Sequence, residues 1–122
     1  MQRRKKIMLT LTIKRPWFNM IVGGAKKEEY REVKPYYDSR FMNLFGAIWA
    51  DGKLLQGEDV PEEIRKDPIQ EIVFRNGYSR NDQEIRTRCR LAYGEGRQEW
   101  GAEPGKKYYI LKIEEVVDDG KE

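Results

Sequence analysis

The sequence predicts a single domain of the α+β class, built on a small and strongly bent sheet or barrel. Its 122 residues are enough for one hydrophobic core. Three observations favour this class. Five segments have the apolar pattern of β-strands, glycine-rich turns separate them, and two prolines, Pro16 and Pro35, each begin a short helical pattern.

The N-terminal third contains both expected helices. Residues 7–14 are predicted to form the first strand, because every second residue is Ile or Leu. Pro16 suits the first turn of a helix, where its missing N–H needs no partner, and Gly23-Gly24 end that helix. A second strand is expected over residues 26–33, before the helix that Pro35 begins. The expected apolar faces are Trp17, Met20 and Ile21 in the first helix, and Tyr37, Phe41 and Leu44 in the second.

The middle of the chain is predicted to be a long loop. Residues 45–68 contain several Gly and Pro residues, with a short acidic helix near residues 61–66. A loop of this length in a small domain is either functional or an insertion. One alternative function is therefore a protein-interaction module that binds its partner through this loop.

The C-terminal half contains three expected strands, over residues 69–75, 84–93 and 107–117. In the 84–93 strand, alternation predicts that Ile85, Thr87, Cys89 and Leu91 face inward and that Arg86, Arg88 and Arg90 face outward. Cys89 is then an unreactive side chain that packs in the core. The domain is expected to span residues 7–117, between a basic tail at 1–6 and a frayed end at 118–122.

Two absences limit the chemistry. The chain has no His and a single Cys, which excludes Ser-His-Asp triads, Cys-His pairs, intrachain disulfides and nearly all zinc sites. We therefore expect neither a metal nor a cofactor. No apolar run approaches the ~18 residues of a membrane span, and the basic start lacks a signal-peptide core. A cytoplasmic protein without a membrane partner is expected.

The charge is unevenly distributed. Residues 1–40 contain 11 Lys and Arg against 4 Asp and Glu, a net charge of +7, whereas residues 41–122 carry −4. A basic region of this kind is typical of proteins that bind an anion, nucleic acid first. It is equally compatible with a surface that keeps a small protein in solution.

The densest charged segment follows the double glycine, from Gly24 to Arg31. Glu29 and Arg31 are two apart on a strand and project from one face, and Lys26 lies where the chain leaves the turn. Together they can hold a phosphate or the edge of a base, or act as an acid–base pair beside a cation. Ion pairing along a strand is the simpler interpretation. Because opposite charges stabilise each other, we expect them to raise the pKa of Lys26 and to disfavour catalysis.

These residues resemble a known family. The segment Ile13-Lys14-Arg15-Pro16-Trp17 and the pattern Gly24-x-Lys26-x-x-Glu29-x-Arg31 are similar to the ASCH domain, which has a PUA-like fold. The segments 74–79 and 99–105 look like small ASCH proteins of phages and mobile elements. The resemblance covers about residues 7–117, nearly the whole chain.

The resemblance implies a five-stranded mixed β-barrel with short flanking helices. It also implies a cleft over the signature that binds RNA or a modified nucleoside near Lys26, Glu29 and Arg31. Some relatives are ribonucleases, or amidohydrolases acting on an acylated cytidine. The amidohydrolase pattern has a Thr three residues after the Lys, where this chain has Glu29. The nucleophile of that pattern, or its equivalent, is therefore missing here, which counts against this particular activity. A cofactor-free hydrolase that acts on RNA or an acylated nucleoside through Lys26 and Glu29 remains an alternative to a binding domain. A phage-type protein-interaction module is a second alternative.

Further residues extend the expected site. Trp17 can stack on a base, although its helical spacing also suits a core position. The outward arginines of the 84–93 strand are spaced to follow a phosphate backbone, or to protect an edge strand by charge. The predicted rim of the cleft is Lys14, Trp17, Arg75, Asn76 and Tyr78, and the predicted nucleic-acid face is Arg86, Arg88 and Arg90. The sequence favours binding of RNA or a nucleotide-like ligand.

Overall fold

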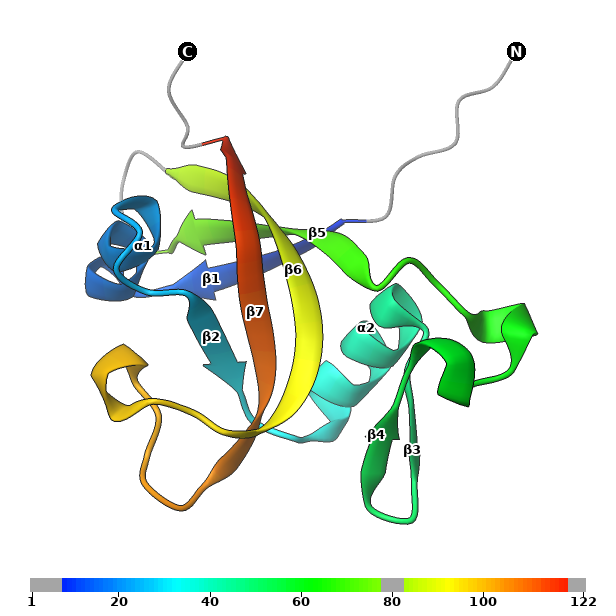
Figure 1. Cartoon of the computed structure of the whole chain (residues 1–122). Helices are drawn as coiled ribbons and strands as arrows, with labels where there is room; N and C mark the ends of the chain where they lie inside the picture. The colour runs from blue at the N-terminus through cyan, green and yellow to red at the C-terminus, as the bar shows by residue number, and fades with distance from the viewer. Residues whose placement is uncertain (1–7, 78–82, 119–122) are drawn as a thin grey trace, which may run out of the picture.

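The computed structural model describes residues 8–77 and 83–118, and it contains the five expected strands and both helices (Figure 1). Tyr78 and the two predicted tails, apart from residue 118, lie outside the described residues. In chain order the elements are β1 (Leu9–Ile13), α1 (Arg15–Val22), β2 (Glu28–Arg31), α2 (Pro35–Phe45), β3 (Ile48–Ala50), β4 (Lys53–Leu55), η1 (Gly57–Asp59), η2 (Glu62–Ile64), β5 (Ile69–Asn76), β6 (Glu84–Glu95), η3 (Gln98–Trp100) and β7 (Lys107–Asp118).

Five strands form one mixed sheet in the order β1-β5-β6-β7-β2. β1 and β5 are parallel, and the other neighbours are antiparallel. The long strands β6 and β7 curl, so the sheet wraps into a half-barrel (Figure 1). The α+β class and the strongly bent sheet are confirmed. The sheet is a half-barrel because no ladder among the described residues joins its edge strands, β1 and β2.

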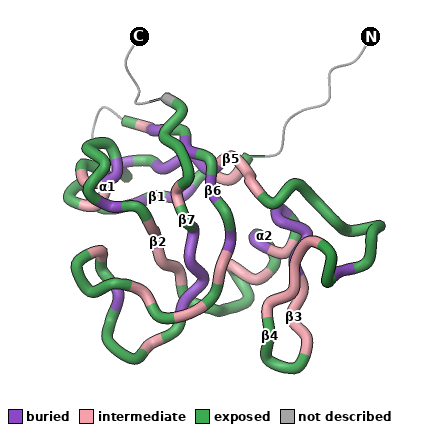
Figure 2. Tube along the Cα trace, in the orientation of Figure 1, coloured by how far each residue is buried: buried purple, intermediate pink, exposed green. Residues whose placement is uncertain are grey.

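The inner face of the half-barrel holds the core. The predicted alternation of β6 is confirmed, with buried Ile85, Thr87, Cys89 and Leu91 and exposed Arg86, Arg88 and Arg90. Figure 2 shows buried segments along the strands of the sheet and exposed chain around η1 and η2. Burial raises the pKa of the Cys89 thiol to about 12. The reactive thiolate is therefore scarce at neutral pH, as inert packing requires.

Both helices contact β5, and the prolines lie in their first turns as predicted. The predicted face of α1 is partly wrong: Phe18 and Ile21 are buried, whereas Trp17 and Met20 are only partly buried. The wholly apolar Phe18 enters the core. The Trp17 ring instead lies 4.9 Å from the ammonium nitrogen of Lys26, which accounts for its place at the border of the core.

Residues 45–68 are more ordered than the expected loop. They contain the β3–β4 hairpin and two short 3₁₀ turns, η1 and η2, the second in place of the acidic helix. The Trp49 indole donates a hydrogen bond of 2.7 Å to the hydroxyl of Tyr109 in the core, which ties the hairpin to β7. The hairpin is not predicted from the sequence because strands of three residues are too short to show an alternation of apolar and polar residues. The turn pair Asp51-Gly52 is their one signal in the sequence.

Candidate ligand-binding site

A single side chain links the two edge strands of the half-barrel. Arg31 of β2 donates a hydrogen bond of 2.9 Å from Nη2 to the backbone carbonyl of Thr12 in β1. Edge strands leave backbone groups unpaired, so this contact satisfies one of them across the open side of the sheet. The candidate pocket lies at this place.

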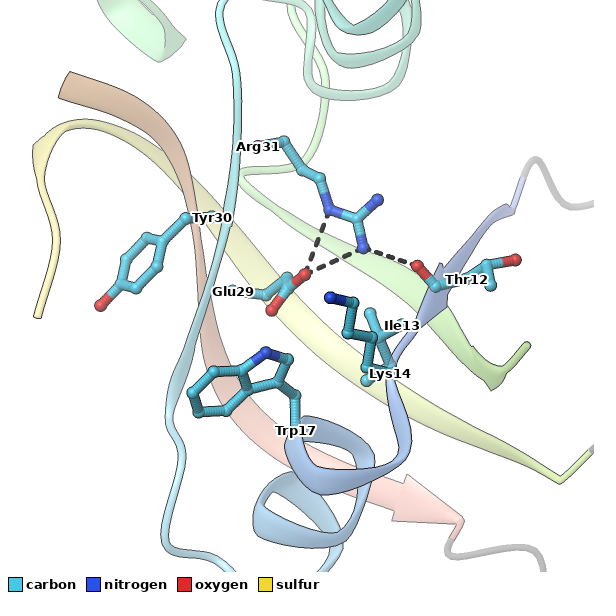
Figure 3. Close-up of a pocket in the computed structure, with 7 residues that line it drawn as sticks. All are labelled: Thr12, Ile13, Lys14, Trp17, Glu29, Tyr30 and Arg31. Carbon is cyan, nitrogen blue, oxygen red and sulfur yellow. Dashed lines mark hydrogen bonds and ion pairs between the residues drawn. The ribbon is translucent and has the colours of Figure 1, made fainter. Parts of the chain in front are cut away.

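The pocket has a volume of about 300 Å³, at the lower end of the range for small-molecule sites. Figure 3 shows side chains from β1, α1 and β2 arranged around one space. The lining residues are Thr12, Ile13, Lys14, Trp17, Glu29, Tyr30 and Arg31. Four of these, Lys14, Trp17, Glu29 and Arg31, are site residues that the sequence predicts. The other three, Thr12, Ile13 and Tyr30, belong to the two edge strands β1 and β2.

Lys26 lies behind the pocket wall, and it is only 1% exposed. Its ammonium forms an ion pair with Glu29 at 3.3 Å and donates a hydrogen bond to the backbone carbonyl of Trp100. The ring centroids of Trp17 and Tyr30 lie 4.9 and 5.1 Å from its Nζ. A buried ammonium requires partners of this kind. Lys26 therefore supports the wall of the pocket and does not line it.

Glu29 joins Lys26 to Arg31. Its Oε2 accepts two hydrogen bonds from Arg31, of 3.1 Å from Nε and 2.9 Å from Nη2. Arg31 is held in turn by the Tyr37 hydroxyl, which accepts a hydrogen bond of 3.0 Å from Nη1. A guanidinium that grips a carboxylate through two N–H groups fixes its orientation. The three charged residues predicted from their spacing do converge, and Glu29 is the centre of the group.

Burial reverses the predicted electrostatics of Lys26. Desolvation lowers the pKa of Lys26 below its usual value of 10.5, and the attraction of Glu29 offsets this only in part. The charges adjacent in the sequence favour the ammonium, but the burial that opposes them is not visible in the sequence. The expectation of a raised pKa is therefore wrong.

The pocket has unused hydrogen-bonding capacity. A carboxylate oxygen accepts two hydrogen bonds, and Oε1 of Glu29 faces only Lys26 among the described residues. One of the two N–H groups on Nη1 of Arg31 goes to Tyr37, and the other has no hydrogen-bond partner among the described residues. Within the described part of the chain, the exposed Lys14 ammonium has no ion-pair partner. The lining residues thus carry spare capacity of three kinds: an acceptor on Glu29, a donor on Arg31 and the cation of Lys14.

Two predicted rim residues are placed elsewhere. Arg75 is exposed and pairs with Glu84 on β6 at 2.6 Å. Asn76 is fully buried at the end of β5. Both stand in register with residues 12 and 13 of β1, but neither lines the pocket. Tyr78 lies outside the described residues.

The Arg86, Arg88 and Arg90 row lies on the outer face of β6. β6 has β5 and β7 on its two sides, so the interpretation of the row as a charged edge strand is wrong. Each guanidinium lies 3.7 Å from a carboxylate of a neighbouring strand: Glu71 for Arg86, Glu115 for Arg88 and Glu114 for Arg90. These carboxylates reduce the positive charge that the row presents to a phosphate backbone.

The chain matches no protein-family model, no curated protein and no solved structure. The resemblance to the ASCH domain therefore rests on the sequence motifs. In residues 8–77 and 83–118, no group of three or more Cys, Asp or Glu residues is arranged to hold a metal ion. Neither helix in these ranges is both long and apolar enough to cross a membrane.

Lys26→Ala tests the structural role of the buried ammonium. The change leaves Glu29 with one cationic partner fewer and opens a cavity, so we expect the free energy of unfolding to fall by about 3 kcal/mol in urea denaturation. Lys27→Ala is the matched control, because Lys27 is exposed, and its effect should stay below about 0.5 kcal/mol. Equal stabilities of the two variants would contradict a supporting role for Lys26.

Proposed function

We propose that the chain is a PUA-like domain that binds RNA or a nucleotide-like ligand in the pocket between β1 and β2. The observation that carries this proposal is the carboxylate of Glu29, held by Lys26 and Arg31 and lining the pocket together with Trp17 and Lys14. The ASCH-like pattern of residues 24–31 supports the same site.

Glu29 and Arg31 match the polar edge of a base. Cytosine and adenine each present an amino donor next to a ring-nitrogen acceptor. Oε1 of Glu29 can accept a hydrogen bond from the amine, and the remaining N–H on Nη1 of Arg31 can donate one to the ring nitrogen. Both side chains are already fixed, Glu29 by Lys26 and Arg31 by Tyr37. Binding therefore costs little side-chain conformational entropy.

Trp17 and Lys14 match the other parts of a nucleotide. The Trp17 ring is partly buried and lines the pocket, and proteins that bind single-stranded RNA stack bases on such rings. Lys14 is exposed at the end of β1. It can neutralise a phosphate without breaking an ion pair among the described residues.

Trp17→Ala tests the stacking contact. With cytidine 5′-monophosphate as the probe, calorimetry should show binding weakened by about 1–3 kcal/mol, which is roughly 5- to 150-fold in Kd. Trp49→Phe is the control, because Trp49 lies on the β3–β4 hairpin and does not line the pocket. A folded Trp17→Ala variant with the affinity of the wild type would place the base elsewhere.

Lys14→Ala tests the phosphate contact. Binding of a single-stranded RNA oligonucleotide should weaken as salt rises, because bound cations are released. Loss of one phosphate contact should make the slope of log K against log salt shallower by about 0.7 in fluorescence anisotropy titrations. Lys53→Ala, an exposed lysine on β4, should retain the slope of the wild type. A wild-type affinity that does not change with salt would contradict the phosphate contact.

A cofactor-free hydrolase is the second candidate, because burial lowers the pKa of Lys26, as a lysine base requires. Against it, the Lys26 side chain is enclosed by Trp17, Tyr30 and the Trp100 carbonyl. A binding domain should release no product from acylated cytidines or short RNAs. Product from the wild type and Lys27→Ala, but not from Lys26→Met, would establish the hydrolase instead.

A further inference from the structure

The β6–β7 connection contacts the back of the pocket, although none of its described residues is among those that line it. The Trp100 side chain donates a hydrogen bond of 2.8 Å from Nε1 to the backbone carbonyl of Ala25. The Trp100 carbonyl accepts a hydrogen bond from Lys26. One residue of η3 therefore holds both the backbone before Lys26 and the ammonium that orients Glu29.

The same segment holds the ring of Tyr30, a lining residue. The backbone N–H of Arg97 donates a hydrogen bond of 2.9 Å to the Tyr30 hydroxyl. At Gly96, a Cβ atom would lie 2.5 Å from the Tyr30 ring, so the backbone passes directly against it. The position of Tyr30 thus depends on the path of residues 96 and 97.

The end of η3 also contacts Trp17. Gly101 follows η3 with a φ of +106°, a conformation that favours glycine. A Cβ atom at this position would lie 3.1 Å from Cζ2 of the Trp17 indole. The backbone at Gly101 is therefore packed against the ring to which we assign base stacking.

These contacts reach three pocket residues from one short segment: Trp17 and Tyr30 directly, and Glu29 through Lys26. We propose that residues 96–101 are positioning residues for the pocket, which set the relative placement of the Trp17 ring and the Glu29 carboxylate. The expected effect on nucleotide affinity rests on the proposed function. The positioning itself does not, because it concerns contacts within the chain.

Gly101→Ala is the test, and Gly105→Ala is its matched control. Both glycines lie in the β6–β7 connection and have a positive φ, of +106° and +78°, so both alanines impose the same kind of backbone strain. They differ in surroundings: a Cβ atom at 105 would meet nothing within 4 Å, whereas one at 101 would meet the Trp17 ring.

Two readouts separate positioning from stability. The chain has three Trp, so its indole N–H resonances can be assigned by single Trp→Phe variants. Gly101→Ala should shift the Trp17 indole resonance without any ligand, and it should weaken binding of cytidine 5′-monophosphate about tenfold or more. Gly105→Ala should leave that resonance in place and the Kd within about twofold of the wild type.

The outcomes are distinguishable. If the wild type binds no nucleotide, the proposed function fails, while the indole shift still tests the positioning. An unmoved Trp17 resonance in Gly101→Ala, or equal affinities of the two glycine variants in a protein that binds, would overturn the inference. If Gly101→Ala does not fold, Trp100→Phe replaces it, because it removes the indole hydrogen bond to Ala25. The Trp17 resonance should then shift, and an unchanged resonance would again overturn the inference.

Discussion

Burial of the Lys26 ammonium is the constraint on which the pocket depends. A charge that is 1% exposed must be paired and hydrogen-bonded, and the fold meets this need with Glu29 from β2 and the carbonyl of Trp100 from the β6–β7 connection. The partners that stabilise the ammonium are thereby fixed in position. Glu29 presents a preoriented carboxylate to the pocket because its other contacts, to Lys26 and Arg31, are satisfied within the protein.

The open edge of the half-barrel explains why the pocket lies where it does. A closed barrel would pair β1 with β2 and fill the space between them, whereas here their contact includes the side-chain bond from Arg31 to Thr12. Arg31 therefore links two edge strands and orients a carboxylate in the same pocket. Its guanidinium suits this role because its donors lie in a rigid fork.

The sequence predicted what depends on local pattern and missed what depends on tertiary contact. Periodicity and chain geometry explain the alternation in β6, the prolines in the first turn of each helix, and the shared face of Glu29 and Arg31. The burial of Lys26 and its bond to Trp100 do not, because these residues are 74 apart in the chain. The predicted rim is wrong at Arg75 and Asn76. Arg75 is directed outward and pairs with Glu84, whereas Asn76, the next residue of the strand, is buried. Trp100 lay in a segment that resembled ASCH proteins, but nothing local in that segment indicated its partner.

The most direct test is a crystal structure of the protein soaked with cytidine 5′-monophosphate. We expect density for the base against Trp17, with its amino group within hydrogen-bond distance of Oε1 of Glu29 and its phosphate near Lys14. Lys26 should remain buried behind the wall, bound to Glu29 and Trp100, as it is without ligand. A nucleotide bound along Arg86, Arg88 and Arg90, or an empty pocket at saturating nucleotide, would contradict nucleotide binding between β1 and β2.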